Sequence, residues 1–180
     1  MPLISTTTVW FLFIASPVYP ANPAIMPKTS STELLRPANP PESRAAAAIQ
    51  AFFDAFGAGD LDALVATFTG DAIITAVRTA ERDENAAGVY GTYRGHAGVR
   101  AFVANLGANF DTKAFDVERI VGEGDDVAFA TGSFTHVVKA TGREFSSDWA
   151  LMCVVTDGRI SEYRFFEDSA AFATASSPND

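Results

Sequence analysis

The side chains best suited to acid–base chemistry lie late in the chain. Asp148 precedes Trp149 in the stretch SSDWALM, His136 lies in GSFTHVVKA, and Tyr163 opens YRFFED. A carboxylate among aromatic groups can have a raised pKa, an imidazole titrates near neutral pH, and a phenol can donate a hydrogen bond. We hypothesise that Asp148 and His136 form an acid/base pair that Tyr163 assists.

Each of these three residues also has a purely structural interpretation. Asp148 could be solvated near the edge of its strand, and Tyr163 could be a core or rim aromatic. His136 could lie on the outer face of a sheet or at a contact between two copies of the chain. The residue types alone leave these alternatives open.

Other reaction chemistries lack their motifs in this sequence. The chain has two histidines, His96 and His136, and neither H-x-H nor H-E-x-x-H spacing occurs. It has no glycine-rich phosphate loop and no G-x-S-x-G motif. Its one cysteine, Cys153, lies in the apolar run ALMCVV, which indicates a core residue and not a nucleophile. We therefore expect no metal site and no cofactor.

The composition limits the class of protein. The chain has 180 residues, of which 48% are hydrophobic and fifteen are Phe, so one domain with a substantial core is expected. Its formal charge of −9 repels phosphate backbones, which argues against nucleic-acid binding.

The first 43 residues differ from the rest because they hold most of the prolines. This content predicts a disordered or extended segment. The run VWFLFIA at 9–15 has the length of a signal-peptide core, but no Lys or Arg precedes it, and it is too short to span a bilayer. We expect a cytoplasmic protein, with secretion open if residues 1–24 act as a signal peptide.

From residue 44 to residue 173 the pattern predicts one folded domain, followed by a flexible tail at 174–180. Ser43 is a helix cap, and Phe52 and Phe56 follow at helical spacing. The dipeptide Asp157-Gly158 is a strong hairpin signal, and Asp168 can cap a short closing helix. The expected order is helices at 43–56 and 60–68, strands at 71–77 and 92–95 joined by a long loop, a helix near 96–110, and strands at 113–122, 126–139, 143–156 and 159–167.

These elements predict an α+β fold in which a curved antiparallel sheet wraps on three helices as a cone. The space between the first helix and the sheet is the natural internal pocket. Strand alternation gives the last strand two faces, one with Ser161, Tyr163, Phe165 and Glu167 and the other with Glu162, Arg164 and Phe166.

Several phrases in this order resemble the nuclear-transport-factor-like superfamily. They are GAGDLDALVATFTGDA at 57–72, YRGHAGVRAF at 93–102, TGR at 141–143 and WALMCVVTDGRISEYRFFED at 149–168. The superfamily includes SnoaL-type polyketide cyclases, ketosteroid isomerases and limonene epoxide hydrolases. The resemblance implies the same cone, but the fold hosts enzymes, binding modules and dimerisation domains alike.

The chain departs from these relatives at their catalytic positions. The resemblance places Ala76 where the isomerases carry an Asp base, and Phe52 where they carry a Tyr. It places Phe165 at the first acid of the epoxide hydrolases, whereas Asp148 loosely matches the neutral Asp of the isomerases. Alanine cannot move a proton, so steroid isomerisation by that mechanism is not expected.

Two functional hypotheses follow. The first is a cofactor-free isomerase, cyclase or hydrolase that acts on a small hydrophobic or polycyclic molecule. The second is a non-catalytic ligand-binding or dimerisation module. In either case we expect a homodimer through the outer sheet face, and a pocket lined by six residues: Phe52, Phe56, Ala76, Tyr90, Trp149 and Phe165.

Overall fold

The structure is a computed structural model that describes residues 43–80 and 88–177. The expectations for residues 1–42, for 81–87 of the long loop and for 178–180 of the tail lie outside the described residues. The elements are α1 (Arg44–Ala58), α2 (Leu61–Ala66), β1 (Phe68–Ala76), β2 (Gly91–Arg94), α3 (Gly95–Asn109), β3 (Phe110–Glu123), β4 (Val127–Val138), β5 (Arg143–Thr156), β6 (Arg159–Glu167) and α4 (Ser169–Ser176). Their order agrees with the order expected from the sequence.

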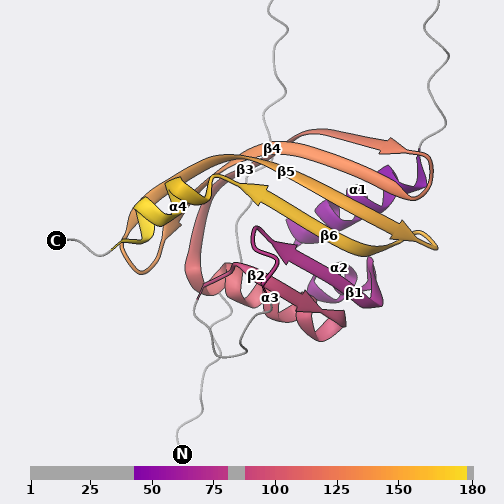
Figure 1. Ribbon diagram of the computed structural model, residues 1–180, viewed down its shortest axis with the longest axis horizontal. Helices are drawn as coiled ribbons and strands as arrows, with labels where there is room; N and C mark the ends of the chain where they lie inside the picture. Colours follow the sequence, from indigo (N-terminus) through magenta and orange to yellow (C-terminus); the bar gives the residue numbers. More distant parts are fainter. Residues whose placement is uncertain (1–42, 81–87, 178–180) are drawn as a thin grey trace, which may run out of the picture. The chain divides into compact units, whose positions relative to one another are not determined.

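The strands form one six-stranded sheet in the order β2-β1-β6-β5-β4-β3, and its long strands bend strongly (Figure 1). The sheet is mixed, because β1 runs parallel to β6 while all other neighbours are antiparallel. The expectation of an antiparallel sheet is wrong at this one pairing. Hairpin turns mark antiparallel neighbours in the sequence, whereas a pairing between the first and last strands leaves no local signal.

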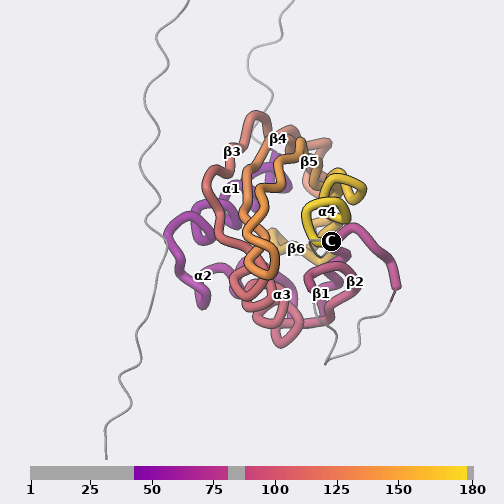
Figure 2. Tube along the Cα trace, turned by 90° about the vertical axis from the view of Figure 1, so that its left-hand side faces the viewer, coloured from indigo at the N-terminus to yellow at the C-terminus, as the bar shows by residue number. Residues whose placement is uncertain are grey.

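The helix α1 packs across the sheet and defines its inner face. Its buried residues recur at helical spacing and include Ile49 and Phe52. Figure 2 shows α1 beside β3 and β4, and α3 beside β1 and β2. The core therefore lies between the inner face of the sheet and the helices, as a cone requires.

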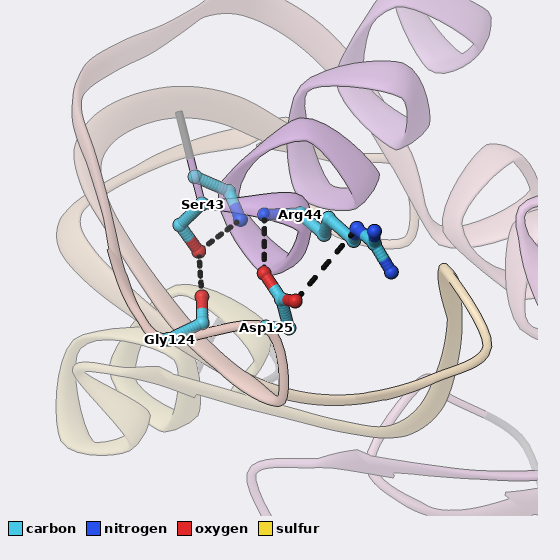
Figure 3. Close-up of polar contacts among 5 residues, drawn as sticks. Ser43, Arg44, Gly124 and Asp125 are labelled. Carbon is cyan, nitrogen blue, oxygen red and sulfur yellow. Dashed lines mark hydrogen bonds and ion pairs between the residues drawn. The ribbon is translucent and has the colours of Figure 1, made fainter. Parts of the chain in front are cut away.

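The beginning of α1 is attached to the turn between β3 and β4 (Figure 3). The Ser43 hydroxyl accepts a hydrogen bond from the Ala46 N–H and donates one to the carbonyl of Gly124. The Arg44 N–H donates to Asp125 Oδ1 at 3.4 Å, and Arg44 Nε lies 3.7 Å from Asp125 Oδ2. One serine therefore caps the helix and joins it to a turn that is distant in the sequence.

The closing helix α4 ends at Ser176, three residues beyond the predicted domain end at residue 173. Asp168 caps it, because its Oδ1 accepts hydrogen bonds from the N–H groups of Ala170 and Ala171, each at 2.9 Å. The expected role of Asp168 is thus present. Near the end of this short helix, Thr141 Oγ1 donates a hydrogen bond to the carbonyl of Ala175, which attaches residues beyond 173 to the domain.

Candidate functional site

The structure separates the proposed pair Asp148 and His136. The side chains of β4 and β5 alternate strictly, which places His136 on the inner face, where it is 8% exposed. Asp148 is exposed on the outer face, opposite Ser133 of β4. The two groups lie on opposite sides of the sheet, so they cannot act as an acid/base pair in one cavity.

His136 is a stacked ring of the interior. Its imidazole lies 4.9 Å from the ring of Phe110 and 4.2 Å from that of Phe134, and both rings are nearly parallel to it. Burial lowers the pKa of His136 to about 4, so the ring is neutral at physiological pH. Its Nδ1 atom is buried without a hydrogen-bond partner, which is uncommon for a polar atom inside a protein.

Tyr163 lies among aromatic side chains on the inner face. Its ring centroid is 5.5 Å from Phe52, 5.8 Å from Phe102 and 6.3 Å from Phe165. Burial raises the pKa of the Tyr163 hydroxyl, so the phenol keeps its proton. No contact joins Tyr163 to His136 or to Asp148.

The residues expected to line a pocket meet in the interior in two groups. Trp149 stacks on Phe165 with ring centroids 5.5 Å apart. Ala76, in β1, is the register partner of Phe165, in β6. Phe52 stacks on Phe56 with centroids 6.0 Å apart and also contacts Tyr163, so both phenylalanines belong to this first group. Tyr90 belongs to the second group, which lies where β6 ends and α4 begins.

The second group contains a carboxyl that the sequence hypothesis did not select. Tyr90 Oη donates a hydrogen bond to Glu167 Oε1 at 2.5 Å. Glu167 shares the inner face of β6 with Tyr163 and Phe165, as alternation predicts, and it is the register partner of Trp149. Glu167 could have been found from that alternation, but a glutamate at the end of a strand is usually solvated.

The surroundings of Glu167 change its acidity. Burial raises the pKa of its carboxyl from 4.5 to about 7, although the hydrogen bond from Tyr90 opposes this rise. Burial and the nearby Glu167 charge together raise the pKa of Tyr90 well above its usual value. A carboxyl that titrates near neutral pH can both accept and return a proton, and a phenol beside it remains a donor.

The other face of the sheet carries a separate polar hollow. It has a volume of about 470 Å³ and is lined by Ala114, Asp116, Ser133, Phe134, Thr135, Ser146, Ser147, Asp148 and Asp168. Asp148 therefore belongs to an acidic outer surface. Among the described residues, no group of three or more His, Cys, Asp or Glu side chains is placed to hold a metal ion.

No helix in the part of the chain that the structure describes is long and apolar enough to cross a membrane.

Comparisons with known proteins agree with this architecture. An NTF2-like protein from Burkholderia xenovorans LB400 is 25% identical, with a TM-score of 0.63 over 74% of this chain and 96% of that chain. The structure of TerC co-crystallised with polyporic acid is 19% identical, with a TM-score of 0.61 over 74% and 98%. A Xanthomonas campestris protein assigned to the polyketide cyclases is 17% identical, with a TM-score of 0.60 over 74% and 97%.

No curated protein sequence matches the chain. The family model of the SnoaL-like domain, in contrast, matches residues 49–163, which run from α1 to Tyr163 in β6. This range contains most of the cone and the first group of aromatic residues. The chain therefore belongs to the SnoaL-like domain family.

Proposed function

We propose that this domain binds a small hydrophobic or polycyclic molecule and moves a proton on it with Glu167, as a cofactor-free isomerase, cyclase or hydrolase. The observation that carries the proposal is the hydrogen bond of 2.5 Å between Tyr90 and Glu167 in an aromatic interior. The raised pKa of Glu167, about 7, supports it, because general acid–base catalysis is most efficient when the pKa lies near the working pH.

The elementary step is proton transfer next to a carbonyl group. The ionised Glu167 carboxylate takes a proton from a carbon beside the carbonyl, and the electrons of that C–H bond move toward the carbonyl oxygen. The carboxyl then returns the proton to the same carbon or to another one, so isomerisation or cyclisation by this step consumes no co-reactant, whereas hydrolysis would consume one water molecule. Tyr90 holds the carboxyl in place through its hydroxyl.

The surrounding rings support an apolar substrate. Trp149 is the register partner of Glu167. The ring of Phe165 stacks on the ring of Trp149, with centroids 5.5 Å apart. A relative of the same fold, TerC, was crystallised with polyporic acid, and another is assigned to the polyketide cyclases. At sequence identities of 19% and 17%, the similarity to these two proteins concerns the fold alone. The proposed substrate class therefore rests on the aromatic interior of this chain.

Exchange of carbon-bound hydrogen tests the proposal. We choose 2-tetralone, a bicyclic ketone with acidic hydrogens beside its carbonyl, and follow deuterium incorporation from D₂O by NMR. Wild-type protein should accelerate the exchange, and Glu167→Gln should reduce that acceleration about 100-fold or more, because acid–base groups contribute roughly 10²–10⁴-fold.

The matched control is Asp148→Asn, which changes a carboxylate on the outer face. It should leave the exchange rate unchanged. Equal rates in wild-type protein and Glu167→Gln would contradict proton transfer by Glu167.

The second candidate function is a non-catalytic ligand-binding or dimerisation module. It is favoured by the replacement of the family's acids by Ala76 and Phe165, which both lie on the inner face. Exposed Phe129 and Phe166 on the outer face favour an association surface. Binding of a polycyclic ligand without any exchange of 2-tetralone would favour this candidate.

A further inference from the structure

The helix α4 places one aromatic side chain beside the Glu167–Tyr90 pair. Of its residues, only Ala175 is buried, whereas Ala171 and Phe172 are half-buried. The helix is held at its start by the Asp168 N–H, which donates to Ser147 Oγ at 2.8 Å, and at its end by side chains that bind the Ala175 carbonyl. Between these attachments, Phe172 is the only aromatic anchor of the helix.

The ring of Phe172 occupies a place between two sets of groups. On one side its centroid is 4.9 Å from that of Tyr90, which binds Glu167. On the other side it is 5.6 Å from Phe110 and 5.4 Å from Phe145. A flat ring in this position therefore contacts aromatic side chains on both sides and lies beside the Tyr90–Glu167 pair.

A polar atom without a partner lies behind this ring cluster. His136 stacks on Phe110 at 4.9 Å and lies 6.5 Å from Phe145, the same two rings that contact Phe172. Its Nδ1 atom is buried and makes no hydrogen bond. A buried polar atom without a hydrogen bond is unfavourable, and a ligand with a suitable polar group would satisfy it.

We propose that the ring of Phe172 occupies the ligand's place, and that a flat molecule of two or more aromatic rings, polar at both ends, displaces it. One polar end meets the Tyr90–Glu167 pair, the rings stack against Tyr90 and Phe145, and the other polar end meets His136 Nδ1. Phe172 then determines how readily the site opens, and His136 selects ligands that carry a second polar group. This inference rests on the ligand-binding half of the proposed function.

Two fluorescent probes test the inference, 2-naphthol and 2,6-dihydroxynaphthalene, which differ by one hydroxyl at the far end. Phe172→Ala should bind both probes about tenfold more tightly or better, because a site whose open state is populated at 10% or less gains that factor when it is held open. The control Phe166→Ala removes an exposed ring from the outer face and should leave both affinities unchanged.

The second hydroxyl tests the role of His136. Wild-type protein should bind 2,6-dihydroxynaphthalene about three- to tenfold more tightly than 2-naphthol, as expected for one added hydrogen bond. His136→Phe keeps a stacked ring and should abolish that preference. An equal preference in His136→Phe and in wild-type protein would remove His136 from the site.

Amide hydrogen exchange on wild-type protein provides a test that needs no variant. With saturating 2,6-dihydroxynaphthalene, the N–H of Phe172, which donates to the Asp168 carbonyl at 3.1 Å, should exchange faster because its helix loses its anchor. Slower exchange, or weaker binding in Phe172→Ala, would overturn the displacement of Phe172. If Phe172→Ala does not fold, Phe172→Leu replaces it.

The proposed function and this inference fail in different ways. If wild-type protein and Phe172→Ala both fail to bind either probe, the ligand-binding half of the proposed function is wrong, and the inference fails with it. If the probes bind but 2-tetralone is not exchanged, proton transfer fails and the inference stands.

Discussion

At the scale of single residues, burial shifts the pKa values of two titratable groups, the half-buried Glu167 and the buried His136, in opposite directions. The pKa of Glu167 is raised to about 7, and that of His136 is lowered to about 4, in both cases because burial disfavours the charged form. Both groups are therefore neutral in the folded protein over part of the acidic range, between about pH 4 and pH 7. Their effects on stability run in opposite directions across that range.

The wild-type protein should lose stability as the pH rises because Glu167 ionises, and Glu167→Gln should not show this loss. The folded pKa lies above the ordinary 4.5, so the stabilising contribution of the protonated group is complete below pH 4.5 and is lost as the pH rises through about 7. The difference between wild type and variant should change by at most about 3 kcal/mol across this window. Urea unfolding at pH 4.5 and pH 8 measures it.

The control for that experiment is Glu162→Gln, which changes an exposed glutamate of the same strand. Its stability difference from wild type should be the same at both pH values. A Glu167→Gln variant that also showed no pH dependence would mean that the carboxyl is not buried in solution.

His136→Phe should have the opposite effect. The folded pKa of about 4 lies below the ordinary 6.5, so the contribution of the neutral ring is complete above pH 6.5 and is lost as the pH falls through about 4. The variant should therefore lose less stability than wild type when the pH is lowered from 7 to 4. Thermal melts over this range give the answer, and parallel curves for the two proteins would refute it.

At the scale of elements, the attachment of α1 to the β3–β4 turn depends on Ser43. Its hydroxyl caps the helix by accepting from Ala46 and also donates to Gly124 (Figure 3). A Cβ on Gly122 would overlap this hydroxyl, so the strand approaches the helix closely only because a glycine stands there. The first helix is thereby positioned over the sheet that it covers.

Ser43→Ala should destabilise the domain by about 1 kcal/mol, within the usual range of about 0.5–2 kcal/mol for loss of an N-cap. Asp125→Ala is the comparison, because its ion pair with Arg44 is exposed, and such pairs contribute about 0–1 kcal/mol. Urea unfolding of both variants ranks the two contacts. A larger loss in Asp125→Ala would show that the two contacts of Asp125 with Arg44, and not the Ser43 cap, attach the helix.

At the scale of the whole molecule, the outer face of the sheet exposes apolar side chains. Val121 is 50% exposed, Phe129 42% and Phe166 46%, and Val121 and Phe129 are register partners on neighbouring strands. Exposed apolar groups that gather on one face often mark association surfaces. The chain remains predicted to form a homodimer through this face.

Phe129→Asp should convert the predicted dimer to a monomer with little effect on folding, because the side chain is already exposed. Light scattering at micromolar concentration measures the mass, and Asp62→Ala, on α2, serves as the control. Wild-type protein that is monomeric under these conditions would contradict the prediction.

The sequence by itself determined the order of the elements, the caps at Ser43 and Asp168, and the extents of the last two strands. The prediction of strands at 143–156 and 159–167 matches β5 and β6, because turn residues and alternation are local signals. The same alternation correctly placed Tyr163, Phe165 and Glu167 on one face. The family resemblance, carried by several local phrases, is also confirmed.

Only the tertiary structure decided which of these residues can do chemistry together. Both faces of β5 are partly apolar, so alternation alone does not indicate whether Trp149 or Asp148 faces inward. Trp149 faces inward because α1 packs on that side of the sheet. The parallel pairing of β1 with β6 and the meeting of Tyr90 with Glu167, 77 residues apart, depend on contacts between distant segments. A pKa depends on what surrounds a group after folding, and that surrounding is not encoded within one strand.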